Sequence, residues 1–226
     1  MELSIFDVLG PIMIGPSSSH TAGAARLSRI AGLIAGDNYK YVRFGLYGSF
    51  EKTYRGHGTD RALVAGALGL MENDERLSES FELAKKAGLE WEFYPDNDLD
   101  GLHENSVRMT FTLSDGSERE IIGCSVGGGQ IVIRSIDGFE TEITARSVTL
   151  IVMQHDRPGV ISHITSVLSE NGINIGTMKL SRRGKGDLAC TVIETDTPIT
   201  DDIIKAVGKL DDIIRVQALN LREGDN

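Results

Sequence analysis

Near its beginning the chain carries the stretch Gly15-Pro16-Ser17-Ser18-Ser19-His20-Thr21. Gly-Pro is a turn signal, and the alanine- and glycine-rich residues 22–34 that follow predict a helix. A serine before a helix caps it, because its hydroxyl oxygen accepts a backbone N–H that the first turn leaves free. One serine is enough for a cap. Three hydroxyls at the positive end of a helix dipole also favour a small carboxylate or phosphate. His20 adds a group that exchanges protons near neutral pH. A serine-rich cap with a chance histidine is the simpler alternative.

A second loop of similar chemistry follows a predicted strand at 41–47. It reads Arg55-Gly56-His57-Gly58-Thr59-Asp60 and leads into another helix predicted at 61–70. A histidine and a hydroxyl therefore stand twice at the beginning of a helix of small residues, and such helices can approach each other closely. The repetition favours one composite site. Capping by Thr59 and Asp60 is the simpler interpretation.

Two further polar motifs lie among the predicted strands of the first part. His103-Glu104-Asn105 precedes a strand at 107–113, which forms a hairpin with 118–123. That hairpin leads to Ser125-Val126-Gly127-Gly128-Gly129. Three consecutive glycines are costly in conformational entropy. They indicate backbone that adopts positive φ or approaches a ligand closely, and a flexible turn is the alternative.

The last third of the chain predicts a compact unit of its own over 148–226, after a linker at 141–147 and a first domain at 1–140. Strands are predicted at 148–153, 173–181, 188–194 and 213–221, and helices at 160–169 and 198–210. The order βαββαβ predicts a ferredoxin-like antiparallel sheet with two helices on one face. The fold class is therefore α+β, and a binding or assembly role suits the second unit.

Composition narrows the function classes. The 226 residues are 40% hydrophobic and 25% charged, as in soluble globular proteins. A net charge of −10 argues against nucleic acid and anionic membrane surfaces as partners. No apolar run approaches membrane-spanning length, and the first residues lack the basic region of a secretory signal. We therefore expect a cytoplasmic protein. Its two cysteines, Cys124 and Cys190, provide neither a disulfide framework nor a complete metal site.

The four motifs resemble, in order, those of iron–sulfur-dependent L-serine dehydratase (L-serine ammonia-lyase), over roughly residues 3–135. The second part resembles an ACT domain, in which the loop Asp156-Arg157-Pro158-Gly159 stands where such domains often bind amino acids. The whole layout looks like the beta subunit of the two-chain form. The first part is also similar to the allosteric substrate-binding domain of some D-3-phosphoglycerate dehydrogenases, which implies an α/β fold but no chemistry.

The resemblance implies conversion of L-serine to pyruvate and ammonia, in amino-acid metabolism and gluconeogenesis. It also implies an alpha partner that carries a [4Fe-4S] cluster, so that the enzyme is a heterodimer and this chain supplies no metal ligand. The ACT unit would bind an amino-acid effector, or only join two copies of the chain. A serine-sensing regulatory subunit without chemistry and a structural assembly subunit are the alternative functions.

The matching positions suggest roles for individual residues. His57, in its glycine-flanked loop, is the expected base for the Cα proton, and His20 is the second choice or a carboxylate ligand. The expected substrate-binding residues are Ser17, Ser18, Ser19, Thr21, Thr59, Asp60, His103, Asn105, Ser125, Gly127 and Gly128. The expected effector-binding residues are His155, Asp156, Pro158 and Gly159.

Overall fold

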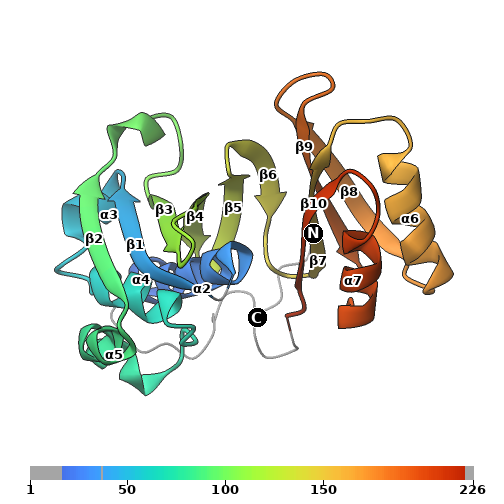
Figure 1. The fold of residues 1–226 in the computed structure, drawn as a ribbon. Helices are drawn as coiled ribbons and strands as arrows, with labels where there is room; N and C mark the ends of the chain where they lie inside the picture. Colours follow the sequence, from blue (N-terminus) through green and yellow to red (C-terminus); the bar gives the residue numbers. More distant parts are fainter. Residues whose placement is uncertain (1–16, 37, 222–226) are drawn as a thin grey trace, which may run out of the picture. The chain divides into compact units, whose positions relative to one another are not determined.

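The computed structural model describes residues 17–36 and 38–221, and the turn predicted at Gly15-Pro16 lies outside them. The chain divides into two compact units, Met1–Gly138 and Phe139–Asn226, each with its own sheet and helices (Figure 1). The predicted α+β class is confirmed.

The first unit alternates short helices with strands. In chain order its elements are η1 (Ser18–Gly23), α2 (Ala24–Ala35), β1 (Tyr39–Leu46), α3 (Ser49–Thr53), α4 (Thr59–Ala67), η2 (Glu75–Glu79), α5 (Ser80–Ala87), β2 (Glu90–Pro95), η3 (Asn97–Leu99), β3 (Ser106–Leu113), β4 (Glu118–Gly127) and β5 (Gln130–Ile136). The predicted helices and strands of this unit are all present. The short helix α3 was not predicted.

The sheet of the first unit has the strand order β2-β1-β3-β4-β5. β1 and β2 are parallel, and the remaining neighbours are antiparallel. Helices α2 and α4 lie on one face of this sheet (Figure 1), and α2 contacts β3, β4 and β5. The buried side chains of the sheet include Phe44, Phe111 and Ile121, which share a face. Alternate residues of the same strands, among them Arg43 and Arg108, lie on the opposite, polar face. The helix layer therefore occupies one side only.

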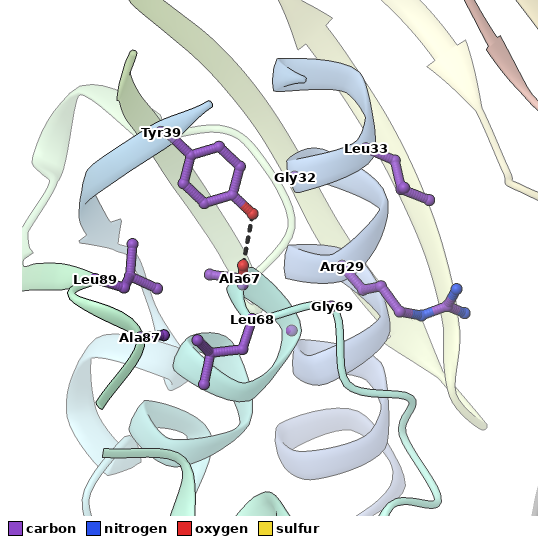
Figure 2. A pocket seen from close by; sticks show the side chains of 10 residues that line it. Arg29, Gly32, Leu33, Tyr39, Ala67, Leu68, Gly69, Ala87 and Leu89 are labelled. Carbon is purple, nitrogen blue, oxygen red and sulfur yellow. Dashed lines mark hydrogen bonds between the residues drawn. The ribbon is translucent and has the colours of Figure 1, made fainter. Parts of the chain in front are cut away.

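Small residues let α2 and α4 approach closely, as the sequence predicts. A Cβ added at Gly66 on α4 would lie 2.8 Å from the backbone nitrogen of Arg29 on α2. Beyond this contact lies a cavity of about 370 Å³ between α2 and α4, where the Tyr39 hydroxyl donates to the Ala67 carbonyl at 2.5 Å (Figure 2). None of the motif residues lines this cavity.

The second unit contains β6 (Phe139–Ile143), β7 (Val148–His155), α6 (Val160–Glu170), β8 (Ile175–Arg182), β9 (Leu188–Thr195), α7 (Asp201–Gly208) and β10 (Ile213–Leu219). Its four-stranded sheet has the order β10-β7-β9-β8, and every neighbouring pair is antiparallel. The predicted ferredoxin-like βαββαβ arrangement is confirmed. Leu150, Ile164, Ile193 and Val207 form part of the core between sheet and helices.

Two boundaries in the second unit differ from those expected. β6 occupies residues that the sequence places in the last part of the first domain and the beginning of the linker, so only 144–147 separate it from β7. α7 begins at Asp201 rather than near Pro198, because Thr200 is its N-cap and its side chain accepts a hydrogen bond from the Ile203 N–H at 3.4 Å.

Candidate active site

The four motifs of the first unit come together at one edge of its sheet. Leu46 at the end of β1 pairs with Val107 at the beginning of β3, and Ser106 pairs with Cys124 near the end of β4. Because β3 runs antiparallel to both neighbours, its beginning lies beside their ends. The loop after β1, the loop before β3 and the turn after β4 therefore share one edge, and η1 packs against β4 and α4 there.

The His20 side chain lies between two serine hydroxyls. Its Nε2 is 3.0 Å from the Ser49 Oγ, and its Nδ1 is 3.4 Å from the Ser17 Oγ. Ser17 is the N-cap of η1, as the sequence predicts, and its Oγ accepts the backbone N–H of His20 at 3.1 Å. η1 is a π-helix, a wide turn that is found frequently at functional sites. Both ring nitrogens of His20 are thus within reach of a hydroxyl.

The second histidine motif packs directly against the first. The rings of His20 and His57 meet edge-to-face, with centroids 5.0 Å apart and planes at 83°. The Thr21 hydroxyl donates to the His57 carbonyl at 3.1 Å. His57 itself is exposed, whereas His20 also packs its ring against the buried Phe50 at 5.3 Å. The two predicted catalytic histidines are therefore neighbours, one held and one open to solvent.

Asn105 and Ser125 connect the third and fourth motifs. The Ser125 N–H donates to the Asn105 carbonyl at 3.1 Å, and the Asn105 Nδ2 donates to the Ser125 carbonyl at 3.5 Å. Ser125 is fully buried and lies against Gly23 of η1. The Ser19 Oγ lies 3.9 Å from the place of a Cβ at Gly127. The glycines of this turn have positive φ, 103° at Gly127 and 59° at Gly128, as the sequence predicts.

The remaining predicted residues lie around these contacts. Thr59 and Asp60 begin α4, immediately after Gly58. Ser18 begins η1, and its carbonyl oxygen lies 3.3 Å from the place of a Cβ at Gly23. His103 is exposed, and its Nδ1 accepts the Asn105 N–H at 3.1 Å. Among the described residues no contact joins the His103 ring to the other two histidines of this unit, so this ring stabilises its own loop.

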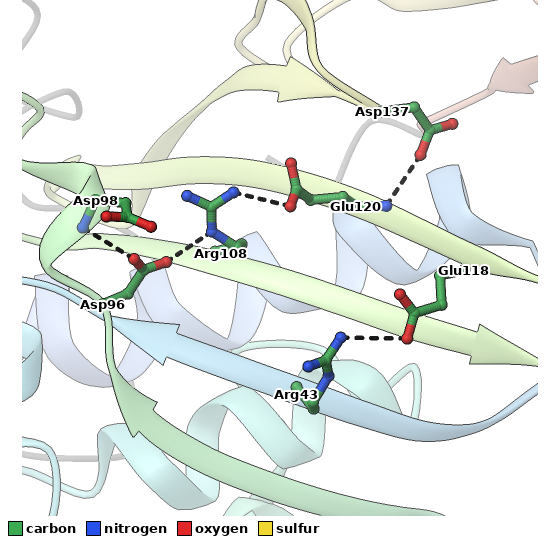
Figure 3. Close-up of polar contacts among 7 residues, drawn as sticks. All are labelled: Arg43, Asp96, Asp98, Arg108, Glu118, Glu120 and Asp137. Carbon is green, nitrogen blue, oxygen red and sulfur yellow. Dashed lines mark hydrogen bonds and ion pairs between the residues drawn. The ribbon is translucent and has the colours of Figure 1, made fainter.

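An ion-pair network holds the loop that carries His103 and Asn105. Arg108 on β3 contacts Asp96 at 2.6 Å and Glu120 on β4 at 2.8 Å (Figure 3). Asp96 is buried and also accepts the Asp98 N–H at 3.1 Å. The Arg43–Glu118 pair, at 3.2 Å on the same face, is more exposed. The Arg108 network therefore fixes Asp96, at the beginning of the segment that leads to His103 and Asn105.

Burial and charge shift the pKa values of two site residues. Burial, and to a lesser extent the neighbouring His57, lower the pKa of His20 below its ordinary 6.5, although a hydrogen bond that the ring donates to the Ser49 backbone acts in the opposite direction. Both burial and His57 therefore favour the neutral form of His20. Burial raises the pKa of Asp60 above 3.8, against the effect of the Arg61 N–H that its carboxylate accepts at 2.8 Å.

Three buried polar atoms at this edge lack hydrogen-bond partners among the described residues. They are the Thr59 Oγ1, the Asn105 Oδ1 and the Ser125 Oγ. Buried polar groups are normally paired, and leaving one unpaired costs free energy. Unpaired hydroxyl and amide oxygens in the second, third and fourth motifs are polar groups to which a small polar ligand could bond.

Sequence reasoning missed two residues of this site, Ser49 and Phe50. From the sequence, Gly48-Ser49 only follows the strand predicted at 41–47, yet Ser49 contacts His20 and Phe50 packs on the same ring. The available signal was the position of this serine directly after the strand, at the edge where the motifs gather.

In the second unit, the predicted effector loop makes hydrogen bonds and an ion pair to other residues of the same unit. The Asp156 carboxylate accepts the Gly186 N–H at 3.0 Å and pairs with Arg182 at 3.3 Å. The Gly186 N–H, with Arg182, lowers the pKa of Asp156. The His155 N–H donates to the Asp212 carbonyl at 2.9 Å. Pro158 is exposed, and Gly159, with φ 91°, is the N-cap of α6. Asp156 thus joins this loop to the β8–β9 hairpin.

The described residues contain no group of three or more histidine, cysteine, aspartate or glutamate side chains arranged to hold a metal ion. Cys124 and Cys190 are both buried free thiols, in different units. Over residues 17–36 and 38–221, no helix has the length and apolar character to cross a bilayer.

Comparison with known proteins agrees with this architecture. Residues 147–212 match the ACT domain family, so the second unit is an ACT domain. Residues 4–87 match the family described as serine dehydratase beta chain.

Individual relatives extend the match over nearly the whole chain. The chain is 41% identical over 206 residues to the L-serine dehydratase beta chain of Peptoniphilus asaccharolyticus, covering 91% of this chain and 93% of that one. It is 40% identical over 213 residues to the "Probable L-serine dehydratase, beta chain" of Bacillus subtilis, covering 94% and 96%. The chain belongs to the family of L-serine dehydratase beta chains. A D-3-phosphoglycerate dehydrogenase of Methanocaldococcus jannaschii is 26% identical over 117 residues, 52% of this chain and 22% of that protein.

Proposed function

We propose that this chain is the beta subunit of an iron–sulfur-dependent L-serine dehydratase and supplies substrate-binding residues and the base. The observation that carries the proposal is the pair of histidines at one sheet edge, with ring centroids 5.0 Å apart, two serine hydroxyls at the His20 ring and the Thr21 hydroxyl on the His57 carbonyl. The family membership given above supports the same reaction, in which L-serine becomes pyruvate and ammonia.

The reaction removes a weakly acidic Cα proton and expels a poor leaving group. The Cα–H and Cβ–O bonds break, water leaves, and the resulting enamine tautomerises to an imine that water hydrolyses to pyruvate and ammonia. A neutral histidine is a suitable base. His57 is the better candidate, because its ring is exposed while both nitrogens of His20 face serine hydroxyls. His20 packs against His57 and keeps that ring in place. The lowered pKa of His20 favours its neutral form, which does not attract the substrate carboxylate as a cation would.

The remaining residues suit binding and orientation. The Ser18 and Ser19 hydroxyls would hold the carboxylate, while Ser17 and Thr21 would shape this part of the site through their hydrogen bonds to His20 and to the His57 carbonyl. The unpaired Thr59, Asn105 and Ser125 oxygens can bond the substrate ammonium and hydroxyl. We place Asp60 near the ammonium group. Gly127 and Gly128 allow the backbone to approach the substrate, and His103 supports this wall through Asn105.

The residues of this chain do not fit a [4Fe-4S] cluster. Four cysteine thiolates hold such a cluster, whereas this chain has two cysteines, both buried and in different units. We therefore assign the cluster to an alpha partner and route no step through it. Such a partner would let this chain take part in the reaction by supplying the base and the substrate-binding residues.

For the ACT domain we propose an amino-acid effector near His155, Asp156, Pro158 and Gly159, and contacts between two copies of the chain. An exposed loop with a positive-φ glycine at a helix beginning supports the first role. The location we propose is the cytoplasm, where the reaction would feed pyruvate to gluconeogenesis.

Pyruvate release from L-serine, measured without oxygen, tests the proposal. The chain is assayed alone, the alpha-type partner alone, and then both together after cluster reconstitution. Activity that needs both chains is the expected result. Full activity of the partner alone would contradict it, and serine binding by this chain without any effect on turnover would favour the alternative of a regulatory, serine-sensing subunit.

A further inference from the structure

Ser49, the first residue of α3, touches two of the loops that form the site. Its Oγ lies 3.0 Å from the His20 Nε2. Its backbone N–H donates to the Glu104 carbonyl at 2.7 Å, immediately before Asn105. The first and third motifs therefore meet at this residue.

The short helix extends these contacts to the second motif. At its other end, the Thr53 hydroxyl donates back to the Ser49 carbonyl at 2.7 Å. The Thr53 carbonyl in turn accepts the His57 N–H at 3.1 Å. The helix that begins at Ser49 thus holds the backbone of His57 while the Ser49 hydroxyl holds the ring of His20.

The place of Ser49 is set by the glycine before it. Gly48 has φ 63°, which a side chain rarely tolerates. A Cβ at this position would lie 2.9 Å from the Glu104 Cα. The chain can therefore leave β1 and present Ser49 to His20 only with glycine at this turn.

The hydrogen bonds around His20 favour one tautomer. The Ser17 Oγ accepts the His20 backbone N–H at 3.1 Å, so its own proton is free to donate to Nδ1 at 3.4 Å. The His20 Nε2 then carries the ring proton and donates it to the Ser49 Oγ, which is the shorter contact. Flipping the ring about its Cβ–Cγ bond would lose both hydrogen bonds, while packing against Phe50 and His57 holds the plane of the ring.

We propose that Ser49 is a positioning residue: it accepts the Nε2 proton of His20, fixes the tautomer and orientation of that ring, and through it the orientation of His57. The catalytic consequence rests on the function proposed above. The structural link between Ser49 and His20 does not, and it is measured separately.

The first measurement is the ¹⁵N spectrum of the imidazoles of the full chain, with His20 assigned from a His20→Gln variant. We expect Nε2 to be the protonated nitrogen in the wild type, and a mixture of tautomers in Ser49→Ala. Ser49→Thr, which keeps the hydroxyl, should restore the single tautomer. Ser80→Ala is the matched control, because Ser80 also begins a helix of this unit and its Oγ has no partner among the described residues.

The second measurement is turnover of L-serine by the same variants with the cluster-bearing partner. We expect Ser49→Ala to lower kcat on the order of 10- to 100-fold with little change in KM, and Ser49→Thr and Ser80→Ala to stay near wild type. A tautomer change without loss of kcat, or a loss of kcat without a tautomer change, would overturn the proposal.

Two further outcomes remain decisive. An unprotonated Nε2 in the wild type would overturn the proposal without any variant, even if Ser49→Ala failed to fold. If the wild-type pair of chains did not act on L-serine, the proposed function would fail, while a tautomer that depends on Ser49 would still support the positioning of His20.

Discussion

Gly23 and Ser125 lie so close that no side chain fits between them. A Cβ added at Gly23 would stand 2.9 Å from the Ser125 Cβ and nearer still to its Oγ. This contact joins the first motif, on η1, to the fourth motif, on β4. The glycine that follows the serine–histidine stretch is therefore part of the site architecture.

Gly23→Ala should push η1 away from β4. Overpacking of this kind costs about 1–3 kcal/mol of unfolding free energy, measured by urea denaturation, and we expect weaker L-serine binding by the assembled enzyme. Gly208→Ala is the control, because a Cβ there meets only the Val216 Cγ2 at 4.0 Å. Equal stability and equal binding in the two variants would show that η1 has room to move.

The order of elements could be predicted from the sequence because each long element has a clear signal. Apolar residues at helical spacing identify α6, and the turns at 114–117 and 182–187 separate paired strands. α3 has only five residues, too few for a periodic pattern. β6 is a short strand, and the sequence placed it partly in the linker.

The site was predictable as a set of motifs but not as a set of contacts. Histidines and hydroxyls at two helix beginnings indicated a composite site, and the structure brings His20 and His57 together. Which partner each ring has depends on sheet register. Ser49 reaches His20 only because β1 ends beside the beginning of β3, and the His103 ring remains with Asn105 in its own loop.

Replacing Arg108 by methionine should destabilise the first unit. It leaves the buried Asp96 carboxylate without its cation, and breaking such a pair costs about 3 kcal/mol, at the lower end of the range because Arg108 is 21% exposed. Arg43→Met removes the exposed pair with Glu118 on the same face and should cost less than about 1 kcal/mol. Urea denaturation compares the two, and similar losses would contradict the role given to Asp96.

The lowered pKa of His20 predicts that the free energy of unfolding depends on pH. Burial and His57 lower this pKa in the folded chain, so just below pH 6.5 the unfolded state binds more protons at this site. The contribution of His20 to unfolding free energy should therefore fall as pH decreases from about 6.5 through the lower folded pKa, and level off below it. An NMR titration should place the His20 midpoint below 6.5, and His57→Ala should raise it. A midpoint above 6.5 would show that the ring is not desolvated.

Asp156 should act as a clamp on the β8–β9 hairpin. Its carboxylate accepts the Gly186 N–H, so Asp156→Ala should speed hydrogen exchange of that amide, while Asp211→Ala at an exposed position should not. Since the Asp156 pKa is lowered in the folded chain, this protection should be present above about pH 4 and lost as pH falls through the folded pKa. Unchanged exchange of the Gly186 amide in Asp156→Ala would contradict this role, because it would show that the carboxylate does not hold the hairpin.

If this chain supplies the base for L-serine dehydration, steady-state pyruvate formation by the assembled two-chain enzyme should depend on His57. His57→Ala should lower kcat on the order of 10²- to 10⁴-fold, with the two chains still eluting together. His163→Ala, at an exposed position on α6, should remain near wild type. Near-normal turnover by His57→Ala would contradict the assignment of the base to this chain's second histidine motif.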